Sequence, residues 1–280
     1  MRAGTCLEVG KGLPGFCGGS IIKEKAGEGK GMDGNYISAV QLTRPLPEGS
    51  YLRGLPAVRY LLENRELRFP KPVTFFVGEN GTGKSTLLEG IAVAYGFNPE
   101  GGTRNFTFST RATHSELYRS LTLVRRAYAS DGFFLRAESL YNLASNIDDM
   151  DGAPSPAPRV VDSYGGVSLH RQSHGESFLA VVRNRFGGNG LYLLDEPEAA
   201  LSPASQMALL AALHRLVEKN SQFIVATHSP ILMAYPGARI YELTPDGVHT
   251  VDYRETEHYQ LTRRFLENPE KMTRILFGET

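Results

Sequence analysis

The stretch GENGTGKS at residues 78–85 is the feature that most constrains the fold of this chain. It follows the apolar run VTFFV (73–77), which has the composition of a buried strand. It opens the segment GKSTLLEGIAVAYGF (83–97), where apolar residues recur at helical spacing up to Gly96. A strand, a glycine-rich turn and a helix in this order match the G-x-x-x-x-G-K-[ST] pattern of a phosphate loop. The motif therefore predicts a phosphate site at the carboxyl end of a strand in an α/β sheet.

The residue types in this loop suit a nucleotide bound with Mg²⁺. Glycines let the backbone curl so that successive N–H groups point at phosphate oxygens, and the helix start adds its positive dipole end. Lys84 is expected to reach the β- and γ-phosphates, and Ser85 is expected to offer its hydroxyl to Mg²⁺. An ordinary glycine turn before a helix is the alternative, but it does not explain the Lys–Ser pair. The candidate nucleotide-binding residues are Gly78, Glu79, Asn80, Gly81, Thr82, Gly83, Lys84, Ser85 and Thr86.

A second candidate site lies in LYLLDEPE (191–198), where two carboxylates follow a short apolar strand. In an open α/β sheet, ligands bind at the carboxyl ends of the strands. Asp195 is expected to hold the Mg²⁺ shell, usually through water. Glu196 is expected to orient and deprotonate the attacking water. The alternative is a solvated strand end, which the presence of a phosphate loop disfavours.

The rest of the chain alternates predicted strands and helices, which is typical of an α/β domain with a mainly parallel sheet flanked by helices. Further strands are predicted in 35–44, 104–111 and 222–229, and the segment 65–80 is expected to hold one or two strands, the second being VTFFV. Helices are predicted in 114–129, 138–147 and 202–220, a hairpin in 239–253, and amphipathic helix from about Glu257. Residues 1–31 contain nine glycines and no periodicity, and we expect a disordered extension there. Residues 32–280 then form the main domain, with a small helical insertion at about 112–165.

The bulk composition excludes few classes of function. Thirty basic and thirty acidic residues cancel, so no global field favours nucleic acid or an anionic membrane. The segment 104–126 is locally basic, either as a solvated helix face or as a contact for phosphate backbone or a partner. No run approaches the roughly 18 apolar residues of a membrane span. The N-terminal stretch also lacks the apolar core of a secretion signal, so a cytoplasmic protein is expected.

Taken together, the motifs GENGTGKST, LYLLDEPEAALSP and FIVATHSP give the chain a family resemblance. It resembles the ATP-binding-cassette (ABC) class of P-loop ATPases over about residues 35–245. Within that class it is similar to the stand-alone bacterial AAA-type ATPases related to RecF and the SMC heads. The resemblance implies a P-loop NTPase fold of ABC-ATPase type, with ATP and Mg²⁺ as ligands. It also implies that His228 is a switch histidine that contacts the γ-phosphate, the alternative being a histidine satisfied at a strand end.

This class also has a signature before its acidic strand, commonly L-S-G-G-Q. The matching residues are Ser173, His174, Gly175 and Glu176, where His replaces a Gly and Glu replaces a Gln. The resemblance implies that they contact the γ-phosphate held by the other subunit, so two copies would enclose two nucleotides as an ATP-dependent homodimer. The alternative is a capping box, S-x-x-E, in which Ser173 and Glu176 only begin a helix. Local chemistry allows both, and the surrounding motifs favour the signature.

The expected function is Mg²⁺-dependent ATP binding and hydrolysis coupled to this dimerisation, in DNA repair or phage defence with DNA or a protein as partner. One alternative is a nucleotide-dependent regulatory switch for a protein partner. Another is the ATP-binding subunit of a transporter. That alternative ranks lowest, because the coupling glutamine of the class has no counterpart between Gln41 and Gln172. The predicted insertion is also too short for SMC coiled-coil arms.

Overall fold

The computed structural model describes residues 35–104, 115–152, 156 and 158–278. All of them belong to one compact unit that spans Asp33–Thr280. The glycine-rich extension predicted at 1–31 and almost all of the strand predicted at 104–111 lie outside the described residues.

A six-stranded sheet forms the centre of this unit, in the strand order β5-β6-β7-β3-β8-β9. The first five strands run parallel, and β9 joins antiparallel through a hairpin from β8. Their bounds are β3 (Val73–Val77), β5 (Asp131–Arg136), β6 (Gly190–Asp195), β7 (Gln222–Ala226), β8 (Arg239–Thr244) and β9 (Gly247–Thr250). This confirms the predicted α/β fold with a mainly parallel sheet.

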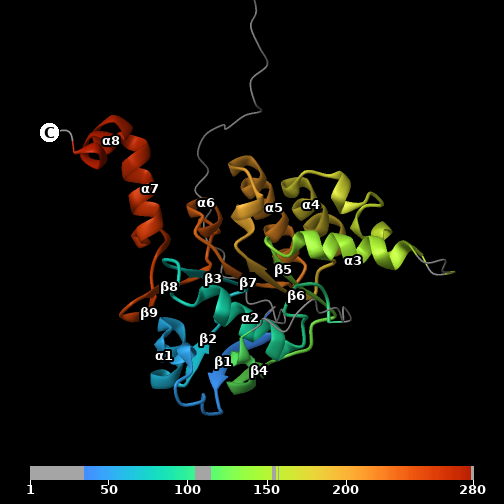
Figure 1. Cartoon of the computed structure of the whole chain (residues 1–280), viewed down its shortest axis with the longest axis horizontal. Coiled ribbons are helices and arrows are strands. Elements are labelled where there is room, and N and C mark those ends of the chain that lie inside the picture. The colour runs from blue at the N-terminus through green and yellow to red at the C-terminus, as the bar shows by residue number, and fades with distance from the viewer. Residues whose placement is uncertain (1–34, 105–114, 153–155, 157, 279–280) are drawn as a thin grey trace, which may run out of the picture. The chain divides into compact units, whose positions relative to one another are not determined.

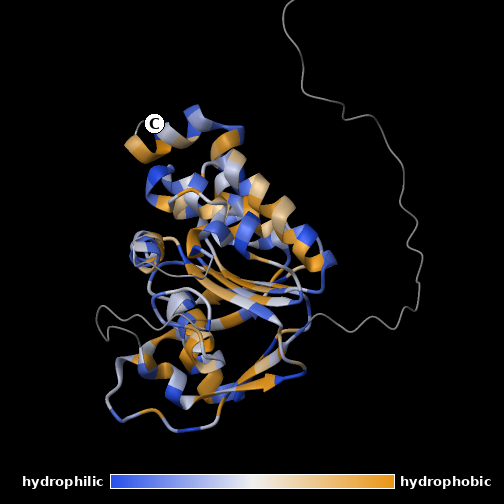
Figure 2. Ribbon diagram, turned by 90° about the vertical axis from the view of Figure 1, so that its right-hand side faces the viewer, coloured by the Kyte–Doolittle hydropathy of each residue, from blue (hydrophilic) through white to orange (hydrophobic). Residues whose placement is uncertain are grey.

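Each side of the sheet packs against its own hydrophobic core, and helices lie on both sides (Figures 1 and 2). In β6, for example, Tyr192 and Leu194 point into one core, whereas Leu191 and Leu193 point into the other. This alternation explains why the strand is apolar throughout, since a parallel strand is covered on both sides. The first core is covered by α3 (Leu140–Gly152), α4 (His174–Ala180), a π-helical turn η5 (Val181–Arg185), α5 (Pro203–Glu218) and α6 (Pro230–Met233).

The second core is covered by two helices and a small sheet. The helices are α1 (Pro56–Asn64) and α2 (Lys84–Tyr95). The sheet is three-stranded and antiparallel, in the order β2-β1-β4, with β1 (Ile37–Leu42), β2 (Glu66–Arg68) and β4 (Leu121–Arg125). Helix α2, which follows the phosphate loop, therefore packs on the opposite face of the central sheet from α4.

The prediction of a helix at 114–129 is wrong. The structure has a short 3-10 helix η2 (Glu116–Ser120) followed by strand β4, which pairs with β1. Leu117 and Leu121 are both buried at a spacing that also fits one face of a helix, so periodicity alone could not distinguish the two. Strand β5 was not predicted, although the helix expected at 138–147 is present as α3.

The chain ends in the predicted amphipathic helices, α7 (Glu257–Glu267) and α8 (Pro269–Phe277), neither of which buries a residue. Figure 1 shows both standing apart from the layers around the sheet. The remaining short helices are η1 (Tyr51–Gly54), η3 (Val160–Tyr164), η4 (Leu169–Arg171), η6 (Pro197–Ala200) and η7 (Tyr253–Glu255). Within the described residues, no helix combines the length and apolarity needed to cross a membrane.

Candidate nucleotide-binding site

The phosphate loop connects β3 to α2, and its glycines are required by backbone geometry. Gly78 has φ 134°, and a Cβ at this position would lie 2.1 Å from the carbonyl oxygen of Leu243 in β8. Gly81 and Gly83 also have positive φ, at 84° and 94°. Gly83 is the N-cap of α2 and has no side chain, so the N-cap residue makes no side-chain hydrogen bond to the N–H groups of the first turn. These donors are available to an anion.

Lys84 lies almost fully buried inside the loop, at 3% exposure. Its Nζ donates to the carbonyl oxygens of Gly78 (2.8 Å) and Glu79 (3.0 Å). Burial lowers the pKa of this ammonium, and the carboxylates of Glu196 and Asp195 oppose the shift. The lysine is therefore held where its charge interacts with the carboxylates at the end of β6. Among the other loop residues, Glu79, Asn80 and Gly81 are exposed, Thr82 is buried with its hydroxyl donating to the Glu79 carbonyl (2.8 Å), and Ser85 and Thr86 are half-buried.

Asp195 ends β6 and is 4% exposed. Burial raises the pKa of its carboxyl to about 6, while the Arg136 guanidinium and a hydrogen bond from Ser85 act in the opposite direction. Its Oδ1 is buried and has no hydrogen-bond partner within the described part of the chain. A carboxylate oxygen without a partner, next to a serine hydroxyl, offers the hard oxygen donors that Mg²⁺ prefers. The two residues fit a magnesium site in which phosphate oxygens and water complete the shell.

Glu196 adopts a left-handed conformation, with φ 46° and ψ 52°, which is uncommon for a residue with a side chain. Its backbone N–H donates to the carbonyl of Ala226 (2.9 Å), so β6 and β7 fix the turn. The side chain is 43% exposed, and its Oε1 lies 3.7 Å from Nε2 of His228. The structure thus brings together the predicted catalytic pair from the ends of two neighbouring strands.

Glu198 is a functional candidate that the sequence reasoning missed. Its carboxylate accepts a hydrogen bond from the Thr227 hydroxyl (2.8 Å) and another from the backbone N–H of His228. Burial raises the pKa of this carboxyl, and these hydrogen bonds oppose the shift. Glu198 therefore holds the His228 segment against the acidic turn. The sequence motif could have indicated this residue, because Glu198 is a third carboxylate, two residues after Glu196, to which no role was given.

Arg136 was also missed, because β5 was not predicted. Its NH1 donates to the Glu89 carboxylate of α2 (2.8 Å), and its Nε lies 3.4 Å from Oδ2 of Asp195. The same guanidinium pairs with Glu138. Arg136 therefore ties the phosphate-loop helix to the acidic strand end. The segment GFFLR (132–136) carried a usable signal: a short apolar run that ends in a charge, as LYLLD does.

The candidate signature residues lie at the start of α4. Ser173 Oγ accepts from the backbone N–H of Glu176 (3.4 Å), and the Glu176 carboxylate accepts from the backbone N–H (2.9 Å) and hydroxyl (2.7 Å) of Ser173. The capping box is therefore formed. A Cβ at Gly175 would lie 2.9 Å from the carbonyl oxygen of Ala200, which explains the glycine by close packing. Ser173, His174 and Glu176 are exposed. Their role toward a second subunit stays a prediction.

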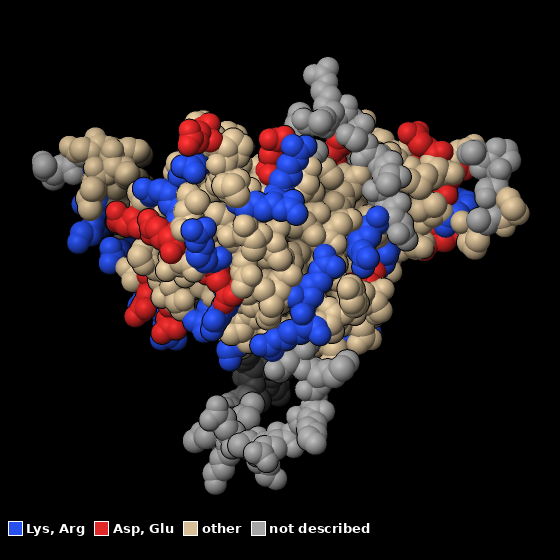
Figure 3. Space-filling model, turned by 90° about the horizontal axis from the view of Figure 1, so that it is seen from below, with Lys and Arg blue, Asp and Glu red and all other residues tan. Residues whose placement is uncertain are grey.

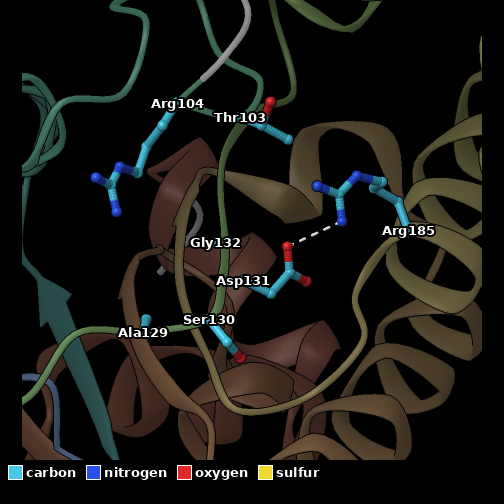
Figure 4. Close-up of a pocket in the computed structure, with 7 residues that line it drawn as sticks. All are labelled: Thr103, Arg104, Ala129, Ser130, Asp131, Gly132 and Arg185. Carbon is cyan, nitrogen blue, oxygen red and sulfur yellow. Dashed lines mark hydrogen bonds and ion pairs between the residues drawn. The ribbon is translucent and has the colours of Figure 1, made fainter.

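The pocket in Figure 4, of about 190 Å³, lies at the opposite edge of the sheet. Asp131 begins β5 in register with Gly190, whereas Arg136 and Asp195 end the two strands. The Asp131 carboxylate pairs with Arg185 (2.9 Å) and accepts from the Tyr192 hydroxyl (2.7 Å). Asp131 therefore connects β5 to β6 at the end of the strands opposite to the candidate nucleotide site.

Two family models match the chain. An AAA-domain model matches residues 55–129, and a second AAA-domain model, whose description names the AbiEii toxin of type IV toxin–antitoxin systems, matches residues 167–234.

Curated relatives include the xylose import ATP-binding protein XylG of Moorella thermoacetica, 28% identical over 54% of this chain and 32% of that protein. The cobalt import ATP-binding protein CbiO of Salmonella typhimurium is 26% identical over 64% of this chain and 70% of that protein. The chain thus spans about a third of the length of the first relative. Among solved structures, the SMC head domain from Thermotoga maritima is 14% identical with a TM-score of 0.41, over 77% of this chain and 98% of that chain.

Proposed function

Because this chain is a P-loop ATPase domain of the ABC/AAA type, we propose that it binds ATP with Mg²⁺, hydrolyses it, and dimerises around the nucleotide. The observation that carries this proposal is the meeting of three segments at one edge of the sheet. Lys84 comes from the phosphate loop, Glu196 from the end of β6 and His228 from the end of β7. The 3.7 Å distance between Glu196 Oε1 and His228 Nε2 supports a pairing of the proposed base with the proposed phosphate-contacting ring.

In the proposed mechanism, the bare start of α2 and Lys84 hold the β- and γ-phosphates. Asp195 and Ser85 hold Mg²⁺, which neutralises charge on the phosphates when bound. Glu196 is ionisable and its side chain is 43% exposed, so it can take the proton of an attacking water. His228 contacts the terminal phosphate through Nε2, which is buried and has no hydrogen-bond partner among the residues that the structure describes.

The exposed start of α4 supports the dimer. Ser173, His174 and Glu176 lie at the surface, and α4 packs on the opposite face of the sheet from α2. An exposed helix start of this kind suits contact with a phosphate held by another copy of the chain. The ALSPAS segment (200–205), which resembles the loop that crosses the dimer interface in this class, adjoins it: the Ala200 carbonyl packs against Gly175.

Replacing Glu196 by Gln tests the assignment of the base. We expect hydrolysis to fall by about 10²- to 10⁴-fold, which is the usual contribution of a general base. ATP affinity should stay within about twofold, because the phosphate loop is untouched, and ATP should accumulate a stable dimer. Steady-state phosphate release, nucleotide titration and size-exclusion chromatography with light scattering measure the three quantities. The matched control is Glu63→Gln, which changes an exposed glutamate on α1.

Wild-type turnover in Glu196→Gln would show that another group takes the proton. A variant that binds ATP but remains monomeric would contradict the dimer and leave the role of the base intact. The two parts of the proposal are thus separated in one set of measurements.

The work that hydrolysis drives is proposed to be DNA repair or phage defence. The description of the second family model, which names a toxin of type IV toxin–antitoxin systems, supports a defence role. Figure 3 shows Lys and Arg side chains gathered in a band across the face that carries α1 and the antiparallel sheet. Exposed arginines on these elements and the adjoining η1 include Arg53, Arg59 and Arg125. A basic band of this kind suits contact with phosphate backbone.

A transporter subunit is the second candidate, because XylG and CbiO are named as import ATP-binding proteins. ATPase rate and oligomeric state, measured with and without double-stranded DNA at two salt concentrations, separate the candidates. A defence or repair ATPase should be stimulated by DNA, and salt should reduce the stimulation. A subunit that needs a membrane partner, or a regulatory switch with slow turnover, should show no response to DNA.

A further inference from the structure

His258, in the first turn of α7, lies against the histidine proposed to contact the terminal phosphate. Its Nε2 is 3.0 Å from Nδ1 of His228, and the two ring centroids are 5.2 Å apart. His258 lies 30 residues beyond His228 in the chain, outside the motifs of the nucleotide site. We propose that His258 is a positioning residue, which sets the tautomer of His228 so that Nε2 of that ring carries the proton. The inference rests on the proposed function of His228.

The surroundings of His228 favour one direction for this hydrogen bond. If His228 donated from Nδ1, its neutral ring would turn the lone pair of Nε2 toward the Glu196 carboxylate, 3.7 Å away. If His258 donates from its Nε2, the N–H of His228 points at that carboxylate instead. The second arrangement places a positive hydrogen beside a negative oxygen, so electrostatics favour it. It also leaves the N–H where a phosphate oxygen can accept it.

The other charges that face His228 support a neutral ring. Burial lowers the pKa of the imidazole, the Lys84 ammonium and His258 lower it further, and Glu196 and Glu79 oppose them. A neutral ring has only one N–H, so the hydrogen bond made by one nitrogen decides what the other can do. Among the described residues, the side chain in contact with Nδ1 of His228 is that of His258. It acts on the site through this contact, in the manner of the outer-shell partners of ligating histidines.

The position of His258 is fixed independently of the rest of α7. The N-cap residue, Thr256, is fully buried, and its hydroxyl donates to the carbonyl of Tyr253 (2.8 Å). The next backbone N–H, that of Glu257, donates to the Glu242 carboxylate of β8 (3.0 Å). Glu242 is in register with Val77, the last residue before the phosphate loop. The first turn of α7 is thus anchored to the strand that supports the nucleotide site.

Three variants of the full chain test the proposal. His258→Leu removes the hydrogen bond, and we expect kcat for ATP to fall about tenfold while the affinity for ATP stays within about twofold. His258→Gln keeps a side-chain N–H donor at a similar reach and should recover most of the rate. His214→Leu is the matched control, since this histidine also has a side-chain partner (Tyr235, 3.3 Å) but lies on α5. It should leave both quantities unchanged.

Nitrogen-15 NMR of the imidazole rings gives a readout that does not depend on turnover. The His228 signals, assigned by their loss in His228→Gln, should show a protonated Nε2 and an unprotonated Nδ1 in the wild type. In His258→Leu they should shift toward a mixture of the two tautomers. If the wild type has its proton on Nδ1, or if His258→Leu leaves the tautomer unchanged, the proposal is wrong. If the wild type does not hydrolyse ATP, the proposed function fails, but the NMR result still decides the role of His258.

Discussion

Helices α2 and α4 begin in opposite ways, although both are candidates for contact with the same phosphate group. Helix α2 follows Gly83, whose left-handed backbone leaves no side chain at the N-cap. Helix α4 follows Ser173, and a complete capping box with Glu176 occupies its N-cap. Both helices present the positive end of a dipole. At the start of α2, where the N-cap has no side chain, the backbone N–H groups can donate to an anion. At the start of α4, the Ser173–Glu176 capping box already uses part of the hydrogen-bonding capacity.

The two starts also differ in burial. Lys84, the first residue of α2, is 3% exposed and already in contact with the loop carbonyls. Ser173, His174 and Glu176 are exposed at the start of α4. All residues of the phosphate loop thus come from one chain, whereas the proposed phosphate contact of α4 requires a second molecule. Variants at the two starts should therefore affect binding and assembly separately.

Lys84→Ala should have the largest effect, because it removes the charged donor of the bare start. Hydrogen bonds to charged groups are worth about 1.5–3 kcal/mol each, so a loss of two to phosphate should raise the Kd for ATP by about 100-fold or more. Turnover and dimerisation should be lost with it. Isothermal titration of ATP with Mg²⁺ measures the change. Lys71→Ala, an exposed lysine just before β3, is the control and should bind as the wild type does.

Ser173→Arg should separate assembly from binding at the capped start. ATP affinity should remain within about twofold, while a long cation in the proposed interface should abolish the ATP-dependent dimer and reduce turnover about 100-fold or more. Analytical ultracentrifugation with ATP, in the Glu196→Gln background, reports the dimer directly. Ser50→Arg controls for the loss of a serine cap, since Ser50 caps η1. Turnover that survives Ser173→Arg would mean that the capping box is the whole role of this residue.

Glu176→Gln should have the smallest effect and restores the residue common in this class. Hydrogen bonds from the Ser173 hydroxyl and backbone N–H lower the pKa of the Glu176 carboxyl from its usual 4.5. Its stabilising contribution is therefore present above pH 4.5 and is lost as the pH falls through the lower pKa of the folded state. Thermal unfolding should show the variant melting no more than a few degrees below the wild type at pH 7. The difference should disappear in acid. A difference that persists in acid would contradict the role of the carboxylate.

The elements around the phosphate loop could be predicted from sequence because local and long-range signals agree there. VTFFV is apolar on both faces and is followed by glycines whose positive φ the structure requires. The segment 114–129 was mispredicted, since the pairing of β4 with β1 depends on residues about 80 positions away and overrides a local helical spacing.

The site shows the same division. Residues that belong to contiguous motifs, such as Lys84, Asp195 and Glu196, could be named from sequence. Arg136 and His258 could not, because only the folded chain brings them to Asp195 and His228. Glu198 lay within a motif, but its contact with Thr227 depends on the neighbouring strand.

At Glu196, the left-handed backbone lowers the stability of the fold, while the side chain at the same position is the proposed catalytic base. A residue with a Cβ in this conformation costs roughly 1–2 kcal/mol relative to its ordinary backbone states. Glycine or asparagine would adopt the same dihedrals more readily. Selection for thermal stability alone would therefore favour substitutions that remove the proposed base. The most stable variants from such a selection would hydrolyse ATP most slowly.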